Sequence, residues 1–276
     1  MSFGEWEIPQ RLPRRPAVHQ LSAGPGYRRP TGERAPPGPG GDAPGRKKDQ
    51  GKSVKQVTVA IIARDEAATI ARVVEAARPL ADELLVIDGG STDGTAEKAA
   101  GAGAVVISDG GRGKGDGVRT AIQRARGEVL VLMDADGSHQ PADIPRLAGP
   151  IIEGRADMVI ASRLRGGSDE FHGTLDNIVR QTGGALISLM LLWRWKADIT
   201  DCENGFRAVD TAKARQLGLR SDGFLIEQEM VIKAIKQGLV IKEIASHEFS
   251  RQGGVSKLKT SQGWKFLWHI FKEMMF

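Results

Sequence analysis

The chain has 276 residues, 26% charged and 40% hydrophobic, which is ordinary for a globular protein and enough for a sizeable core. Collagen, coiled-coil and small disulfide-rich classes are therefore excluded. Cys202 is the only cysteine in the sequence, so neither an intrachain disulfide nor a cysteine-based zinc site can form. The net charge of +5 comes from the first 55 residues, which hold 11 Lys/Arg against 5 Asp/Glu. Because the remainder is nearly neutral, we expect no nucleic-acid partner.

Residues 1–55 also contain 9 Pro and 9 Gly, which predicts a disordered basic tail. Residues 56–276 are predicted to form a single domain. The N-terminus lacks the pattern of a secretory signal. The longest apolar stretch, Gly183 to Trp193, is shorter than the roughly 20 residues of a membrane-spanning helix. We therefore expect a cytoplasmic protein that at most rests on the inner face of the membrane.

From residue 56 onward, β-branched runs alternate with segments whose apolar residues recur at helical spacing. The runs predict buried strands at Val57–Ala63, Leu84–Asp88, Ala104–Ser108, Glu128–Met133 and Asp157–Ser162. The segments between them predict helices at Glu66–Arg78, Thr92–Ala100, Gly117–Arg126 and Pro141–Glu153. This alternation predicts an α/β fold with a doubly wound, mostly parallel sheet and helices on both faces.

The second half of the chain is less regular. Its patterns predict helices at Leu175–Lys196, Phe224–Gln237 and Ser261–Met275, with strands at Asn204–Asp210 and Val240–His247. In the last helix, Trp264, Leu267, Trp268, Phe271 and Met275 share one face. That face either lies in the lipid headgroup layer or packs against the sheet.

Two carboxylates, Asp134 and Asp136, follow the apolar run that ends at Met133. Alternate residues at a strand end point the same way, so both carboxylates can face one cation. Oxygen-only ligands select Mg²⁺ or Mn²⁺, which keep positions open for substrate phosphates. The alternative is a solvated loop with helix-capping aspartates.

The glycine-rich run from Gly110 to Gly117 does not match either common nucleotide-binding motif. A Walker loop needs Gly where Ser108 stands and Ser or Thr where Gly115 stands, and no Gly-x-Gly-x-x-Gly spacing fits. What remains is a loop that carries Arg112 and Lys114 into a helix. Such a loop suits an anionic ligand, although it could also be a plain surface loop.

Five motifs in this order resemble family-2 glycosyltransferases of the GT-A fold, and among them the dolichol-phosphate or polyprenol-phosphate mannosyltransferases. The resemblance covers Val57 to Phe276. The motifs are Ala63-Arg64-Asp65-Glu66, the segment Ile87–Thr95, Gly113-Lys114-Gly115, Asp134-Ala135-Asp136 with Gly137–Pro141, and the segment Arg251–Leu258. The segments Ala161–Arg163 and Asp201–Ala208 also look like parts of this family.

The resemblance implies a role for each matching position. It implies that the nucleotide-sugar donor is bound by Ala63, Arg64, Glu66, Asp88, Lys114, Asp134, Ala135 and Asp136, that Asp134 and Asp136 hold Mg²⁺ or Mn²⁺, and that Asp136, Arg163, Arg251 and Lys257 are catalytic. The sequence departs from the family at Gly89, where a second acidic residue is usual, and at Ser138, where a Gln often helps to hold the metal. The first departure leaves GDP and UDP open as the donor nucleotide. At the second, either Ser138 or His139 substitutes or the metal binds more weakly.

Family members that act on hydroxyl groups carry a Glu-Asp pair before a helix, which supplies the base that an alcohol acceptor requires. The equivalent region here, Phe224 to Met230, lacks that pair. A phosphate monoester needs no such base because it already carries about −1.5 to −2 charges at pH 7. The resemblance, together with the missing pair, implies inverting, metal-dependent transfer of a hexose, mannose from GDP-mannose, to a polyprenyl phosphate. The alternatives are transfer to a soluble metabolite or natural product, and nucleotide-sugar binding without catalysis.

Overall fold

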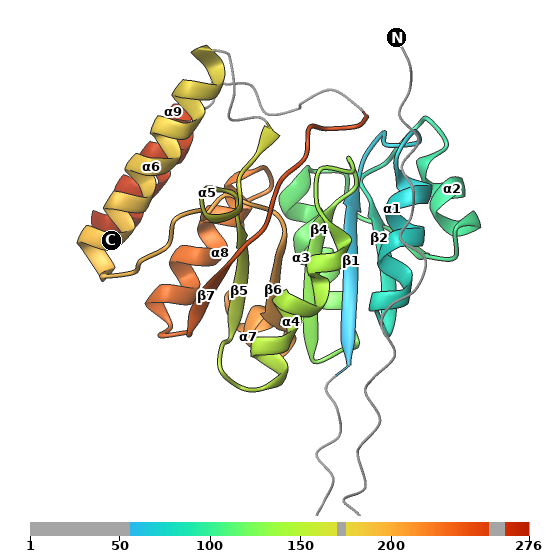
Figure 1. Cartoon of the computed structure of the whole chain (residues 1–276), viewed down its shortest axis with the longest axis horizontal. Coiled ribbons are helices and arrows are strands. Elements are labelled where there is room, and N and C mark those ends of the chain that lie inside the picture. The colour runs from blue at the N-terminus through green and yellow to red at the C-terminus, as the bar shows by residue number, and fades with distance from the viewer. Residues whose placement is uncertain (1–55, 170–174, 254–262, 276) are drawn as a thin grey trace, which may run out of the picture. The chain divides into compact units, whose positions relative to one another are not determined.

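A computed structural model describes residues 56–169, 175–253 and 263–275 (Figure 1). The predicted tail and Lys257 lie outside the described residues. The described strands form one seven-stranded sheet in the order β3-β2-β1-β4-β6-β5-β7. Their bounds are β1 Val57–Ala63, β2 Glu83–Asp88, β3 Val105–Ser108, β4 Val129–Asp134, β5 Met158–Ser162, β6 Arg207–Asp210 and β7 Ile241–Ala245.

The sheet is mostly parallel, as predicted. Strand β1 pairs in parallel with β2 and β4, and β5 pairs in parallel with β7. Strand β6 is the exception, because it lies antiparallel between β4 and β5. The carboxyl ends of β1, β2 and β4 therefore meet at one edge, where open α/β sheets bind their ligands.

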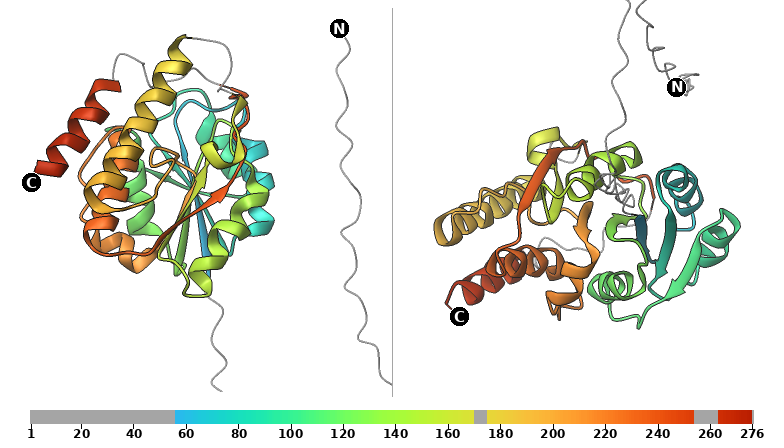
Figure 2. Two further views of the ribbon diagram at one scale, coloured as in Figure 1. Left: turned by 60° about the vertical axis from the view of Figure 1, so that its left-hand side comes forward. Right: turned by 90° about the horizontal axis from the view of Figure 1, so that it is seen from below.

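Helices cover both faces of the sheet (Figures 1 and 2). One core lies between the sheet and helices α1 (Ile70–Ala77), α2 (Thr95–Gly101) and α4 (Ile144–Ile152). The other core contains residues of α3 (Lys114–Arg124), α6 (Leu175–Trp195), α7 (Thr211–Gln216), α8 (Leu225–Lys236) and α9 (Gly263–Met275). Short helices at Arg78–Leu80, Pro141–Asp143 and Arg163–Gly166 complete the described elements. Alternate β1 residues enter opposite cores, Ile61 on one side and Ala60 on the other.

Most predicted elements are present with shifted ends, and two of the shifted boundaries affect the site. Helix α3 begins at Lys114 instead of Gly117, because the Gly113 carbonyl accepts hydrogen bonds from the N–H groups of Asp116 at 3.0 Å and Gly117 at 3.4 Å, which close the first turn. The Gly115 N–H donates to the Asp222 carbonyl at 2.7 Å. Strand β6 begins at Arg207 instead of Asn204. The Asn204 carbonyl is unavailable to the sheet because it accepts a hydrogen bond from the Arg207 Nε at 3.0 Å.

Helix α9 packs through a face that the sequence pattern did not single out. Phe266 and Ile270 are its buried residues, and the Gln228 side chain of α8 donates to the Phe266 carbonyl at 3.2 Å. Of the predicted stripe, Leu267 is half-buried, whereas Trp264, Trp268, Phe271 and Met275 are exposed. None of the helices in the described ranges combines the length and apolar character of a membrane span.

We predict that Gly115→Ala lowers the free energy of unfolding by about 1–3 kcal/mol, because an added Cβ would overlap the Ser221 carbonyl oxygen. Gly149→Ala is the matched control: Gly149 also lies inside a helix, but its added Cβ meets nothing within 4 Å. Its effect should lie between zero and a gain of about 1 kcal/mol. Urea unfolding of both variants checks this, and equal effects would contradict the close approach at Gly115.

Candidate active site

The two carboxylates predicted from the sequence lie at the carboxyl end of β4. Asp134 is the last residue of the strand, and Gly137 adopts the left-handed φ of +77° that turns the chain after Asp136. The Ser138 N–H and hydroxyl both donate to Asp136 Oδ1, at 3.0 and 2.7 Å. The main-chain N–H of Asp134 donates to His139 Nδ1 at 3.2 Å, and the His139 ring stacks on Phe206. Ser138 and His139 thus fix the two aspartates in place.

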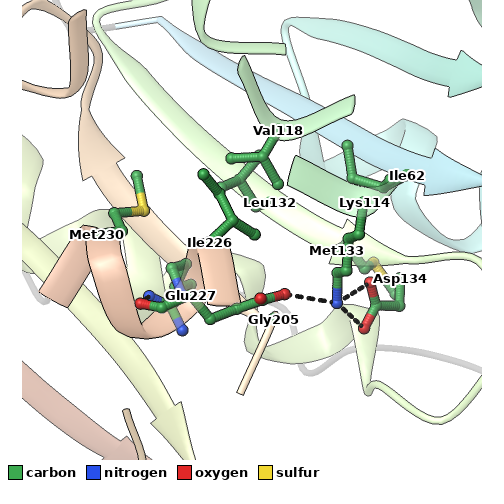
Figure 3. A pocket seen from close by; sticks show the side chains of 11 residues that line it. Ile62, Lys114, Val118, Leu132, Met133, Asp134, Gly205, Ile226, Glu227 and Met230 are labelled. Atoms are coloured by element: carbon green, nitrogen blue, oxygen red, sulfur yellow. Dashed lines mark hydrogen bonds and ion pairs between the residues drawn. The ribbon is translucent and has the colours of Figure 1, made fainter. Parts of the chain in front are cut away.

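Lys114 joins Asp134 to a third carboxylate, Glu227 of α8 (Figure 3). Its Nζ lies 2.7 Å from Asp134 Oδ1, 2.9 Å from Oδ2 and 2.8 Å from Glu227 Oε1. Burial alone would lower the pKa of Lys114, but the two carboxylates outweigh it and raise the pKa above its ordinary value. For Asp134, Lys114 likewise outweighs burial and lowers the pKa. Lys114 is therefore a permanent ammonium between two carboxylates.

These groups line a pocket at the edge of the sheet (Figure 3). Its apolar wall consists of Ile62, Val118, Leu132, Met133, Ile226 and Met230. Glu227 Oε2 is buried and accepts no hydrogen bond within the described part of the chain. The sequence pattern did not identify Glu227 as a site residue, because its contact with Lys114 depends on the packing of α3 against α8.

Arg251 contacts the same edge from the C-terminal part of the chain. Its Nη2 lies 3.0 Å from Asp136 Oδ2, and its Nη1 lies 3.8 Å from Glu66 Oε1. The surrounding loop is held by main-chain hydrogen bonds from Gln252 N to the Asp136 carbonyl and from Phe249 N to the Ser138 carbonyl. The structure thus brings the predicted residues Glu66, Asp136 and Arg251 together.

The loops after β1 and β2 form the rim of the site and are tied to each other. The Ala63 carbonyl accepts from Gly89 N at 2.9 Å, and the Glu66 N–H donates to the Thr95 hydroxyl at 2.8 Å. Asp88 accepts from the Ser91 hydroxyl and from two main-chain N–H groups of its own loop. Asp88 therefore shapes this loop, while Arg64 lies exposed beside it.

Arg163 lies in a separate ion pair. It grips Asp201 in a two-pronged contact, Nε to Oδ2 at 2.7 Å and Nη2 to Oδ1 at 2.8 Å, and its Nη1 lies 3.6 Å from Glu248. Burial would lower the pKa of Arg163, but Asp201 outweighs burial and raises it. The structure does not pair Arg163 with either aspartate of the β4 edge.

The segment before β6 and the first residue of that strand form the floor of the site. The buried Arg207 donates to the main-chain carbonyls of Cys202, Asn204 and Glu227, which ties this segment to α8. A Cβ at Gly205 would lie 2.7 Å from Lys114 Nζ and 2.9 Å from Asp134 Oδ2. A side chain at this position would therefore press on the ion pair. The sequence contains both residues in a family-like segment, but it carries no signal of these contacts.

The carboxylate oxygens at this edge of the sheet suit a hard divalent cation. Asp134 and Asp136 offer carboxylate oxygens from one strand end, the ligand type that Mg²⁺ and Mn²⁺ prefer. No cluster of three or more potential metal ligands occurs within the described ranges. A cation that is shared with a phosphate is usually bound by one or two protein carboxylates. Oxygens of the phosphate and of water complete its coordination shell.

Comparison with known proteins agrees with this fold and site. The family model for glycosyl transferase family 2 matches residues 58–216, more than half of the chain. The chain belongs to this family. It is 34% identical to the glycosyltransferase AglJ of Haloferax volcanii over 195 residues, which cover 69% of this chain and 62% of the relative.

Other comparisons place the chain among glycosyltransferases. It is 31% identical to a dolichol-phosphate mannosyltransferase of Pyrococcus furiosus, covering 74% of this chain and 58% of that protein. The chain thus spans less than two thirds of the length of either relative. Its fold matches glucosyl-3-phosphoglycerate synthase of Mycobacterium tuberculosis, solved with Mn²⁺, UDP and glucosyl-3-phosphoglycerate, with a TM-score of 0.66, 21% identity and 80% of each chain covered. The predicted fold and the predicted membership of glycosyl transferase family 2 are confirmed.

We predict that Glu203→Gln changes the pH dependence of stability. Burial raises the pKa of Glu203 to about 7 despite the opposing charge of Arg163. Between pH 4.5 and 7 the folded chain therefore keeps a proton that the unfolded chain has released, so Glu203 makes stability fall as pH rises. On going from pH 5 to pH 8, the free energy of unfolding of the variant should rise by about 1–3 kcal/mol relative to that of the parent.

Urea unfolding at the two pH values measures this difference. Glu75→Gln, on the exposed side of α1, controls for the loss of one carboxylate. A gain for Glu203→Gln that is the same at both pH values would show that the buried carboxyl does not titrate in this range.

Proposed function

We propose that this glycosyltransferase transfers a hexose, mannose from GDP-mannose, to a polyprenyl phosphate at the cytoplasmic face of a membrane. The observation that carries the proposal is the juxtaposition, at one sheet edge, of the Asp134–Asp136 pair with Lys114 and Arg251. Carboxylates suited to a divalent cation and fixed cations suited to phosphate are what a nucleotide-sugar diphosphate requires. The mannosyltransferase among the relatives supports mannose and the lipid phosphate.

In this proposal Asp134 and Asp136 hold Mg²⁺ or Mn²⁺, which would neutralise the charge that develops on the leaving diphosphate. Such a cation is present in the Mycobacterium tuberculosis synthase structure. The tied rim of Ala63, Glu66 and Asp88 would then hold the nucleotide. An acceptor phosphate oxygen attacks the anomeric carbon, the bond to the diphosphate oxygen breaks, and the nucleoside diphosphate leaves. Direct displacement inverts the anomeric centre.

The chain's own residues favour an acceptor that is already ionised. Gln228 stands directly after Glu227, and its amide is engaged by α9: Nε2 donates to the Phe266 carbonyl, and Oε1 lies 2.8 Å from His269 Nδ1. Glu227 is paired with Lys114. A phosphate monoester needs no base. Arg251 and Lys257 remain our candidates for holding the acceptor phosphate, and Arg163 remains a candidate for lining the reaction centre.

An exposed apolar surface supports the lipid character of the acceptor. Helices α6 and α9 lie side by side (Figure 2) and present outward-facing residues that we call the apolar face: Leu186, Leu189, Leu192, Trp193, Trp264, Trp268, Phe271 and Met275. Patches of this kind mark interaction sites. The exposed Arg194, Lys196, Lys265 and Lys272 flank it. Tryptophans bordered by cations suit the headgroup layer of an anionic membrane.

A soluble phosphate monoester is the second candidate acceptor, because the same cations would bind its phosphate. A lipid acceptor explains the apolar face and a soluble one does not. Nucleotide-sugar binding without transfer is the remaining alternative, and the test below distinguishes all three.

We predict transfer of label from GDP-[¹⁴C]mannose, tested beside UDP-sugars, into an organic-extractable product when polyprenyl phosphate is supplied. Asp136→Asn should lower this transfer at least about 100-fold, as expected for losing one fixed electrostatic element. Asp198→Asn, at an exposed position, is the control. Label only in a water-soluble product would favour the soluble acceptor, and an absence of transfer with intact donor binding would favour the non-catalytic alternative. Full activity in excess chelator would refute the metal assignment.

We also predict that the protein binds vesicles containing anionic lipid and that the double variant Trp264→Ala/Trp268→Ala weakens this binding about tenfold or more. Burying one large apolar side chain contributes about 1.5–3 kcal/mol. Val105→Ala, at an exposed position on β3, is the control. Unchanged vesicle binding, together with a dimer-to-monomer shift in light scattering, would assign the apolar face to a second copy of the chain instead.

A further inference from the structure

The ion pairs at the β4 edge form two triads, each a cation between two carboxylates. The first is Asp134–Lys114–Glu227 and the second is Asp136–Arg251–Glu66. Counted over these six side chains alone, the formal net charge is −2, and His139 Nε2 also lies 4.0 Å from Asp134 Oδ2. A divalent cation carries a charge of equal size and opposite sign. The neighbouring Arg207 donates to main-chain carbonyl oxygens instead.

In the first triad, Lys114 contacts the carboxylate oxygens of Asp134 to which a metal cation would have to bind. Its Nζ contacts both oxygens of Asp134. The Gly205 main chain lies beneath the ion pair, and the Phe224 ring centroid lies 5.8 Å from Nζ. A cation on Asp134 would therefore lie close to the ammonium group of Lys114, which carries charge of the same sign. Lys114 and a bound metal compete for this carboxylate.

The Lys114 side chain can move away from Asp134. Its ammonium sits at the end of a flexible stem of four carbons, and the main chain at its root is fixed by the contact of Gly115 with Asp222. The side chain can therefore swing while its Cα stays in place. A phosphate group bound beside Asp134 would offer the ammonium new oxygens in return.

We propose that Lys114 is an internal counter-ion that bridges Asp134 and Glu227 before the donor binds, and that it passes to the donor diphosphate when a divalent cation binds at Asp134. This inference rests on the proposed function and adds to it a coupling between metal and nucleotide. Lys114 opposes binding of the metal alone and favours binding of the diphosphate. Because linkage is reciprocal, the diphosphate tightens metal binding by withdrawing Lys114 from Asp134.

The test is Mn²⁺ binding to the full chain without nucleotide, measured by the electron paramagnetic resonance signal of free Mn²⁺. Lys114→Met should bind Mn²⁺ about 3- to 10-fold more tightly than the parent. In saturating Mn²⁺, the same variant should bind GDP and UDP at least about tenfold more weakly, measured by calorimetry. Tighter Mn²⁺ binding combined with weaker nucleotide binding is the result expected for the loss of a counter-ion. If Lys114 only supported the structure of the site, its loss would weaken the binding of Mn²⁺ and of the nucleotides alike.

Lys213→Met removes the same charge from the opposite end of the sheet, where Lys213 pairs with Asp157, and should change neither affinity. Lys114→Gln, which can still donate to Asp134, makes the same comparison should Lys114→Met fail to fold. If the Mn²⁺ affinity of the folded Lys114 variants stays the same or falls, the proposed counter-ion role of Lys114 is wrong. A parent chain that binds neither Mn²⁺ nor the nucleotides would instead overturn the proposed function.

Discussion

Charge compensation at the carboxyl end of β4 is the constraint on which the site depends. Four carboxylates, Glu66, Asp134, Asp136 and Glu227, come from three separate parts of the chain and meet around two cations. Without Lys114 and Arg251 these groups would repel one another, and each largely desolvated carboxylate would be costly. The two bridging cations therefore hold the first half of the domain against the second while leaving a net negative charge for a ligand to balance.

The mixed sheet explains how this arrangement is built. Antiparallel β6 reverses the chain beside β4, which brings the preceding loop to the same edge as Asp134. Arg207, the first residue of β6, then binds that loop and the start of α8 through main-chain carbonyls. Gly205 can pass beneath the Lys114–Asp134 pair because it has no side chain. A buried arginine and a glycine thus place Glu227 within reach of Lys114.

The sequence predicted those features that depend on local pattern. The parallel strands were recognisable from β-branched runs, and Asp134 and Asp136 from their position directly after one such run. Contacts between distant segments were not predictable from such patterns. Nothing near Lys114 in sequence indicates Glu227, and Arg163 shows no local sign of its ion pair with Asp201. In α9, helical spacing grouped the tryptophans correctly, but the buried face is Phe266 and Ile270, because α8 presents Gln228 there.

The most direct test of the account is a crystal structure of the chain with Mn²⁺ and GDP, and a second with Mn²⁺ and UDP. The account predicts Mn²⁺ on Asp134 and Asp136, the diphosphate oxygens completing its shell, and Lys114 Nζ within hydrogen-bonding distance of a phosphate oxygen instead of Asp134. Mn²⁺ and nucleotide bound elsewhere, with Lys114 still between Asp134 and Glu227, would contradict it.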